Sequence, residues 1–549
     1  MSQLRDVFFS IRVKTGVFLL LTSCSPKLEN TGVVTNSDGS RKNKATTIFT
    51  YRTDTVINIG SRKELFVDDL LIQELKGTST MRLHEPVPQE ISLVHDQPWE
   101  GAGSGYYSVF QDGSRYRMYY KMWQRTPGPG YPNTDKSPLL TGYAESDDGI
   151  HWRKPNLGLF DFKGSKENNI VIAGGSTGAV SPDAGHPAVF KDENPDVSPD
   201  ALYKALMPEK FDSGNPKGLI AYKSPDGIHW TPLISRPLIS AGAFDSQNIA
   251  FWDSNINMYR AYWRANNKVP ASEENLSGVR RDVRTSTSKD FINWTEWEEL
   301  KYTDSPLENL YVSQIKPYFR APHIYIGFPV RYFDRGWSES MRALPDSAHR
   351  AWRSKPNSRL GTALSESLLM ASHDGRNFKL WRDAFLKPGI ERTGTWSYGG
   401  SFIGWQVVET KSSLPGAPNE LSLYASENYW SGPAASALRR YTLRMDGFVS
   451  INASNLGGDI ITRPLKFSGK KLFLNFSSSI KGDIRVELQD KDGRPLEGFS
   501  IDKCDPVFGD AIERAVIWVG AVDLSSLEGK VVRLRFSLKD ADLYAFQFK

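Results

Sequence analysis

A seven-residue pattern that recurs four times limits the fold of this chain more than any other feature of its sequence. It reads Ser146-Asp147-Asp148-Gly149-Ile150-His151-Trp152, and looser copies begin at Ser224, Ser288 and Ser372. Asp and Gly favour a tight turn, the Ser or Asp side chain can bond to turn amides, and the closing aromatic residue can pack between sheets. Intervals of 64 to 84 residues fit one four-stranded blade of a β-propeller.

The repeat also predicts where the blades lie along the chain. If each turn links the third strand of a blade to its fourth, five inner strands are expected, at residues 105–111, 186–191, 244–253, 310–320 and 396–408. A segment near residues 56–75 is expected to close the ring, since closure removes exposed sheet edges. Residues 56–447 are therefore predicted to form a five-bladed β-propeller.

The strand pattern changes after residue 447. Apolar and polar residues alternate over 531–536, which is typical of a half-buried strand. Residues 448–549 are therefore predicted to form a small C-terminal β-sandwich. The predicted fold class is all-β, and the 15 Trp, 22 Tyr, 28 Phe and 45 Gly residues suit short strands and turns.

The N-terminus has the features of an export signal. Basic residues precede a short apolar stretch that ends in Leu21-Thr22-Ser23-Cys24, which resembles a bacterial lipobox. We expect residues 1–24 to be a lipoprotein signal peptide, Cys24 to carry lipid, and the polar residues 25–55 to be a flexible tether. The alternative is an ordinary secretory signal. Either way the protein is expected in the bacterial cell envelope, and in the first case its only link to a membrane is the lipid anchor.

Charge and motifs exclude several classes of function. The net charge of +5 is spread along the chain without a basic block, which disfavours a nucleic-acid partner. Phosphate-binding, dinucleotide-binding and zincin motifs are missing, so neither a nucleotide nor a cofactor is expected. The 8 His residues have no metal-like spacing, so no zinc site is expected. The sequence does not indicate whether a structural Ca²⁺ is bound.

The candidate site lies where the inner strands begin, because these ends surround one mouth of a propeller and ligands favour that place. Three acidic residues near the predicted mouth, Glu100, Asp245 and Glu308, are candidates for catalysis. Glycoside hydrolysis needs an acid for the leaving oxygen and a carboxylate as nucleophile or base. Candidate substrate-binding residues beside them are Trp99, Asp183, His186, Asn248 and Trp396.

These features resemble the five-bladed glycoside hydrolases of families 32, 43 and 68, which carry acidic residues on inner strands. The resemblance implies that Glu100 is the nucleophile or base, Asp245 the transition-state stabiliser and Glu308 the general acid. The chain departs from family 32 because it lacks the Asn-Asp-Pro-Asn-Gly and Glu-Cys signatures. Arg281-Asp282-Val283 is similar to a family 32 motif, but it falls in a third strand and is expected to point away from the axis.

Arg320, His323 and Arg331 surround the predicted hairpin of blade four. Their side chains could bind a carboxylate or sulfate of an acidic sugar, or they could anchor a loop. The main hypothesis is an exported, exo-acting glycoside hydrolase with a carbohydrate substrate. One alternative is a non-catalytic glycan-binding surface lipoprotein. Another is a lyase or epimerase of uronic acids, which would need a base such as His186 or Tyr311 beside arginines.

Overall fold

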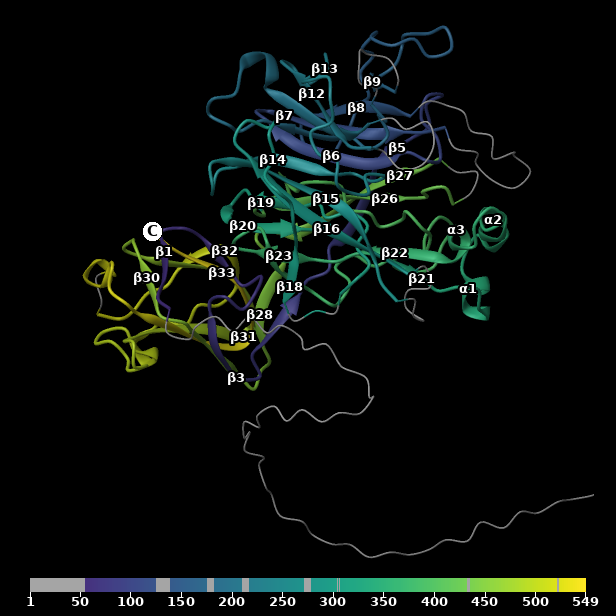
Figure 1. Ribbon diagram of the computed structural model, residues 1–549. Helices are drawn as coiled ribbons and strands as arrows, with labels where there is room; N and C mark the ends of the chain where they lie inside the picture. Colours follow the sequence, from purple (N-terminus) through teal and green to yellow (C-terminus); the bar gives the residue numbers. More distant parts are fainter. Residues whose placement is uncertain are drawn as a thin grey trace, which may run out of the picture. The chain divides into compact units, whose positions relative to one another are not determined.

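The computed structural model describes most of the chain after residue 54 (Figure 1). The predicted signal peptide, Cys24 and the tether up to residue 54 lie outside the described residues. In the part that is described, no helix is long and apolar enough to cross a membrane. The described residues are 55–124, 139–174, 182–209, 217–270, 278–303, 305, 307–431, 435–520 and 523–549.

Five sheets among these residues form the blades of a five-bladed propeller, which confirms the predicted architecture (Figure 1). Blade one comprises β6 (Gly105–Asp112), β7 (Arg115–Met122), β8 (Leu140–Ser146) and β9 (Ile170–Ala173). Blade two comprises β10 (Ala188–Lys191), β11 (Tyr203–Pro208), β12 (Leu219–Ser224) and β13 (Thr231–Pro232). Blade three comprises β14 (Ile249–Asp253), β15 (Met258–Lys268), β16 (Val279–Ser288) and β17 (Glu298–Glu299).

The last two blades depart from the simple four-strand order. Blade four comprises β19 (Lys316–Tyr318), β20 (Ala321–Gly327), β23 (Met370–Ser372) and β24 (Asn377–Leu380), with β18 (Lys301–Thr303) added parallel to β24. Blade five comprises β25 (Val408–Thr410), β26 (Glu420–Glu427), β27 (Ala437–Arg444) and β5 (Val87–Val94).

The ring is closed by β5, and the prediction that residues 56–75 would close it is wrong. β5 pairs with β27 antiparallel, so the N-terminal side does supply the outermost strand of blade five. The predicted segment contains Phe66 and Leu71, which are buried in the C-terminal core. An outermost strand needs little apolar surface, and most residues of β5 are exposed or half-buried.

The four repeated turns have the hydrogen bonds that their sequence predicts. In each turn the serine hydroxyl accepts a bond from the amide of the Asp two residues later, and Asp Oδ1 accepts bonds of 2.7 to 2.9 Å from two following amides. The closing aromatic residue packs against a neighbouring blade in three of the turns, with Trp152 on Tyr424, Trp230 on Tyr119 and Phe378 on Tyr262.

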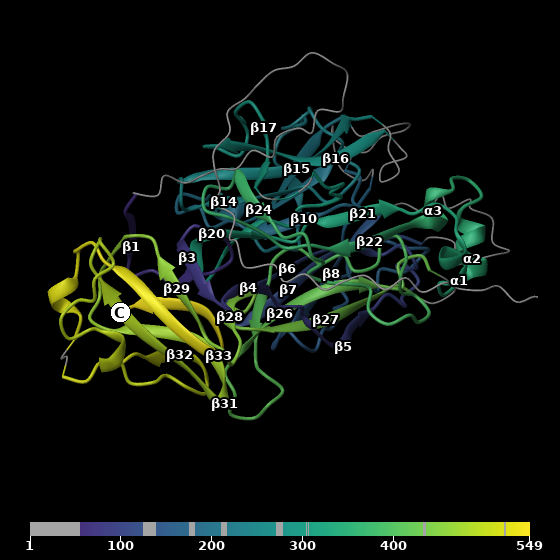
Figure 2. The same ribbon diagram turned by 90° about the horizontal axis from the view of Figure 1, so that it is seen from below.

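The C-terminal strands form a separate β-domain with its own buried core, and strands from before the propeller belong to it (Figure 2). The predicted boundary at residue 56 is therefore wrong: the long strand β33 pairs with β2, and β28 to β30 pair with β4, β3 and β1. The strands are β1 (Ile57–Gly60), β2 (Glu64–Leu65), β3 (Ile72–Gly77), β4 (Thr80–Leu83), β28 (Val449–Ala453), β29 (Gly458–Thr462), β30 (Leu465–Phe467), β31 (Leu472–Gln489), β32 (Asp510–Ala515) and β33 (Arg533–Phe548).

An insertion in blade four carries the α-helices of the described residues. It is a hairpin of β21 (Val330–Asp334) and β22 (Ala363–Ser367), and between these strands lie α1 (Glu339–Ala343), α2 (Ser347–Arg353) and α3 (Arg359–Thr362) (Figure 1). The N-cap Ser338 accepts a hydrogen bond from the amide of Met341, which fixes the start of α1. Short 3-10 helices lie at Pro199–Ala201, Ile501–Lys503 and Ser525–Leu527.

Two buried glutamines cross the centre of the ring and connect all five blades. Gln247 Nε2 lies 2.7 Å from the carbonyl of Pro187 and 3.2 Å from Ser108 Oγ, in blades two and one. Gln314 Nε2 donates to Gln247 Oε1 at 2.7 Å and to the carbonyl of Ile403 at 3.2 Å. These contacts fill the central channel, so the mouth above them is a blind pocket.

Candidate functional site

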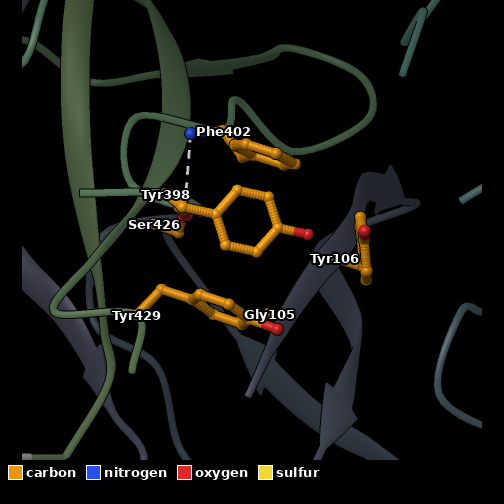
Figure 3. A pocket seen from close by; sticks show the side chains of 7 residues that line it. Gly105, Tyr106, Tyr398, Phe402, Ser426 and Tyr429 are labelled. Atoms are coloured by element: carbon orange, nitrogen blue, oxygen red, sulfur yellow. Dashed lines mark hydrogen bonds between the residues drawn. The ribbon is translucent and has the colours of Figure 1, made fainter. Parts of the chain in front are cut away.

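Aromatic side chains line the mouth where the inner strands begin. In Figure 3 the ring of Tyr398 projects between Phe402 and Tyr429, and Tyr106 stands opposite. The cavity between these residues is small, about 20 Å³. Gly399 has φ 86°, and a Cβ there would lie only 2.1 Å from the Tyr429 ring, so a glycine is required for that ring to lie against the backbone.

The position of Tyr106 depends on an irregularity at the start of β6. Tyr106 has φ 51°, which a residue with a side chain rarely adopts, and the β6–β7 register shifts between Gly105 and Ser108. A bulge of this kind re-aims a side chain. The Tyr106 ring consequently lies 4.9 Å from the ring of His186 and 6.1 Å from that of Phe402.

Three of the predicted residues come together in a chain of ionisable groups. His186 Nδ1 lies 2.9 Å from Asp183 Oδ2, and His186 Nε2 lies 3.6 Å from Asp245 Oδ1. Burial by itself would raise the pKa of Asp183, but His186, the Gly185 amide and Lys121 together outweigh burial and lower that pKa, so Asp183 is ionised. Since a carboxylate can only accept, the proton of the imidazole is on Nδ1, and Nε2 faces Asp245. The Asp245 side chain is 52% exposed and therefore open to a ligand.

Cationic side chains surround the same aromatic rings. Lys121 Nζ lies 4.8 Å from the Tyr106 ring centre and donates to the Tyr429 hydroxyl at 3.1 Å. Arg264 and Arg281 lie 4.9 and 5.3 Å from the ring centre of Tyr311. The Tyr311 hydroxyl in turn lies 2.9 Å from that of Tyr398. Burial lowers the pKa of Arg281, and the nearby Arg264 charge acts in the same direction.

Glu100, predicted as nucleophile or base, is a buried structural group. It is 1% exposed, and its oxygens are contacted by His95, Lys154, the Tyr120 hydroxyl and the Gln97 amide. Burial alone would raise its pKa, but His95 and Lys154 lower that pKa to about 2. The neighbouring Trp99 donates to Asn169 Oδ1 at 2.7 Å and packs on Phe162, so it too stabilises blade one and does not line the mouth.

Glu308 and Arg331 form an ion pair on the opposite face of the β21–β22 hairpin from the mouth. Arg331 lies 3.2 Å from Glu308 Oε1 and 2.6 Å from Glu366 Oε1. Tyr332, the next residue, contacts Tyr311 and Tyr398, and successive side chains of a strand point to opposite faces. The predicted set of Glu100, Asp245 and Glu308 is therefore not brought together.

Three other predicted binding residues have structural contacts. Arg320 pairs with Asp446, and His323 Nε2 lies 3.2 Å from Glu64 Oε2, both at the C-terminal β-domain. Asn248 Oδ1 accepts from the amide of Arg264 at 3.1 Å and so positions β15. These groups lie at strand ends as predicted, but the strand end alone does not specify which mouth they face.

The Trp396 side chain is also directed away from the mouth. Its Nε1 donates to the carbonyl of Gly389 at 2.8 Å. Tyr398, two residues later, occupies the mouth instead. Because Trp396 has φ 54° and the chain there is irregular, strand alternation could not predict which of the two aromatic residues points inward.

Several residues of the mouth are missing from the predicted binding set because they lie outside the inner strands. Arg264 ends the apolar run of β15, and Arg281 is the third residue of β16, so both reach the mouth from the second and third strands of blade three. The neighbouring Asp282 accepts from the Tyr302 hydroxyl and the Val283 amide, away from this cluster. A charged residue at the mouth end of a buried strand is a signal that could have identified Arg264. Among the described residues, no cluster of metal-ligating side chains is present.

Comparisons with known proteins concern the fold. No protein-family model and no curated protein sequence matches the chain. A glycoside hydrolase family 43 arabinoxylan arabinofuranohydrolase from Bacillus subtilis is 15% identical, with a TM-score of 0.38, over 85% of this chain and 99% of that one. The Bombyx mori family 32 β-fructofuranosidase is 10% identical, with a TM-score of 0.37, over 85% and 94%. An N-acetylgalactosamine deacetylase from F. plautii is 13% identical, with a TM-score of 0.38, over 66% and 94%.

Proposed function

We propose that the chain is a carbohydrate-active enzyme that hydrolyses glycosidic bonds in the mouth of the propeller. The observation that carries the proposal is the exposed carboxylate of Asp245 beside the Asp183–His186 pair. The His186 ring lies 4.9 Å from that of Tyr106, which lines the pocket of tyrosine and phenylalanine rings. Aromatic faces suit the apolar faces of sugar rings, and polar groups that converge in an aromatic pocket fix a ligand's orientation.

The geometry supports distinct roles for the two reacting groups. Asp245 acts on the anomeric carbon or on the attacking water, as hydrolysis requires of a carboxylate. His186 is held by Asp183 through Nδ1, and its Nε2 faces the mouth, so it is the group placed to exchange a proton with the sugar. Burial raises the pKa of Tyr398 well above its usual value, so its hydroxyl stays protonated and can donate a hydrogen bond.

The blind pocket favours action at chain ends. Gln247 and Gln314 are 3% and 2% exposed and block the channel below the mouth. A polysaccharide can enter such a pocket with a terminal sugar, whereas an internal segment would need an open groove. Exo-action is therefore part of the proposal.

The first prediction concerns Asp245. The wild-type protein is expected to release sugar from at least one member of a panel of polysaccharides and oligosaccharides, measured as new reducing ends. Asp245→Asn should lower this rate about 10²- to 10⁴-fold, since it removes one acid–base or nucleophilic group. Glu308→Gln is the matched control and should retain most of the activity, because Glu308 pairs with Arg331 outside the mouth.

Full activity of Asp245→Asn would contradict the role of this residue. Binding of glycans by the wild-type protein without any release of sugar would favour the non-catalytic glycan-binding alternative.

A second candidate function is β-elimination, and one observation favours it. The candidate base Tyr311 lies beside Arg264 and Arg281. The other candidate, His186, is linked to Arg264 through Asp245, which lies 3.6 Å from His186 Nε2 and 4.0 Å from Arg264 Nη2. Elimination from a uronic acid needs a base and a cation that neutralises the carboxylate. The same product assay separates the two reactions, because elimination yields an unsaturated sugar that absorbs ultraviolet light and hydrolysis does not.

We also propose that the chain is exported and lipid-anchored through Cys24, on the basis of the sequence alone. The second prediction is that, in a bacterial host, the protein incorporates labelled palmitate and fractionates with membranes. Cys24→Ala should abolish labelling, whereas Cys504→Ala, which replaces a buried thiol, should not. Equal labelling of both variants would contradict the lipid anchor.

A further inference from the structure

We propose that the mouth binds an anionic sugar, and that Arg264 and Arg281, both beside the Tyr311 ring, receive its carboxylate or sulfate group. This inference rests on the proposed function, because it names the substrate class of the same site. It concerns residues that the sequence did not single out for binding.

The first argument is the balance of charge around the mouth. The cationic side chains that contact its tyrosine rings include those of Lys121, Arg264, Arg281 and Arg359. The carboxylates near them are those of Asp183 and Asp245, and Asp183 is already bonded to His186 and to the Gly185 amide. The mouth therefore has an excess of positive charge.

The second argument is the burial of these cations. Lys121 is 2% exposed and Arg264 is 7% exposed. Within the described ranges, neither Lys121 nor Arg281 has a carboxylate partner, and Arg264 Nη2 is 4.0 Å from Asp245. Contacts with aromatic faces stabilise a cation but do not cancel its charge. Since an unpaired buried charge is unfavourable, a bound anion would stabilise the site strongly.

The third argument is the geometry of the arginine pair. Asn266 pairs with Arg281 and Arg264 with Val283, so Arg264 and Arg281 are diagonal neighbours on one face of the β15–β16 ladder. Arg264 Nε is bonded to the Ala243 carbonyl, and Arg281 is held by Asn309, which fixes both side chains. Two ordered guanidinium groups on one face offer the paired donors that carboxylates and sulfates prefer.

The third prediction tests this pair with the full-length Asp245→Asn protein, which keeps the mouth but does not consume the glycan. Its binding would be measured to glucuronate- and galacturonate-bearing glycans, to sulfated glycans, and to the carboxyl-reduced or desulfated form of each. We expect at least one charged glycan to bind about 10-fold or more tightly than its neutral form. Tight binding of a uronate-bearing glycan would identify the bound group as a carboxylate, and tight binding of a sulfated glycan would identify it as a sulfate.

Introducing Arg281→Gln into the Asp245→Asn protein should weaken binding of the charged glycan about 10- to 100-fold, because a charge-assisted hydrogen bond is lost. The affinity for the charged glycan should then be close to that for its neutral form. Arg281→Lys should lie between the two. Arg284→Gln is the matched control on the same strand, because Arg284 lies on the Trp297 ring instead of in the mouth, and its binding should be unchanged.

The inference would be overturned by retention of neutral glycans only, by retention of no glycan, or by a charge preference that Arg281→Gln leaves intact. Its failure can be told from failure of the proposed function. Cleavage without charge preference would contradict only the inference, and charge-selective binding without cleavage would contradict only the hydrolase.

Discussion

At the residue scale, the interfaces between blades show how one position compensates for another. Gly227 and Gly375 have φ 80° and 72°, and a Cβ on either would lie within 3 Å of the hydroxyl of Tyr119 or Tyr262 from the preceding blade. That hydroxyl donates to the carbonyl of the same glycine, at 2.9 and 2.8 Å. In these turns the glycine thus makes room for the tyrosine.

The third turn has the opposite arrangement. Phe291 takes the glycine's place despite φ 67°, and it is fully buried. In blades one to three the turn serine pairs with a residue of the second strand, and the position three residues later faces the next blade's turn. That position is Tyr119 in blade one and Tyr262 in blade three, but it is Leu206 in blade two. The Phe291 and Leu206 side chains belong to one buried cluster. The larger turn residue, Phe291 in place of glycine, is therefore accompanied by a smaller strand residue, Leu206 in place of tyrosine.

The fourth prediction tests this exchange of size. Phe291→Gly should lower stability by about 3 kcal/mol, because it leaves a cavity that relief of the positive φ only partly offsets. Adding Leu206→Tyr should recover most of the loss by restoring the pair found in the other turns. Thermal unfolding midpoints of the two single variants and the double variant measure the effect. A double variant no more stable than Phe291→Gly would show that the two positions are not coupled.

At the element scale, local patterns were predictable and long-range pairings were not. The Ser-x-Asp turns could be predicted because their bonds join residues within three positions of each other. The order of the blades followed from these turns, but all inner strands except β6 are shorter than predicted, and in blade five only Val408 of the predicted segment 396–408 belongs to β25. Asp183, His186 and Asp245 lie just before β10 and β14. The pairing of β3 with β29 joins segments almost 400 residues apart, and no local pattern indicates it.

The same difference accounts for the residues of the site that were misplaced. Glu100 and Glu308 lie in connections, where a side chain's direction depends on contacts such as Lys154 and Arg331 that are distant in the sequence. Asp183 and Asp245 also lie in connections, before β10 and β14, so a position before a strand does not by itself distinguish a residue of the mouth from a structural one.

At the scale of the whole molecule, a buried polar interface joins the propeller to the C-terminal β-domain. Asp446, fully buried, accepts hydrogen bonds from the Tyr318 hydroxyl and Arg320 Nε, both at 2.8 Å. His373 lies in the turn of blade four, and its Nε2 is 3.2 Å from Asp68 Oδ2. This interface explains why Arg320 and His323 occupy one end of the propeller without taking part in the mouth.

The last prediction is a dependence of stability on pH that originates at this interface. Burial alone would lower the pKa of His373, but Asp68 and, more weakly, Glu64 outweigh burial and the nearby Arg62, so that pKa is raised above 6.5. The histidine is thus protonated more readily when folded. Its contribution to stability is complete below pH 6.5 and is lost as the pH rises through the folded-state pKa. The pKa of Asp68 is lowered, since His373 outweighs burial, so its contribution is lost only in acid, as the pH falls through that pKa.

His373→Gln should therefore flatten the fall in the unfolding midpoint as the pH rises above 6.5, and it should lower stability most below that pH. His151→Gln is the matched control, because His151 lies in the equivalent turn of blade one, directly before Trp152, and its side chain is 85% exposed. That variant should follow the wild-type curve. If His373→Gln also follows it, the interface histidine does not govern the response, and the pH dependence must come from the other ion pairs of the molecule.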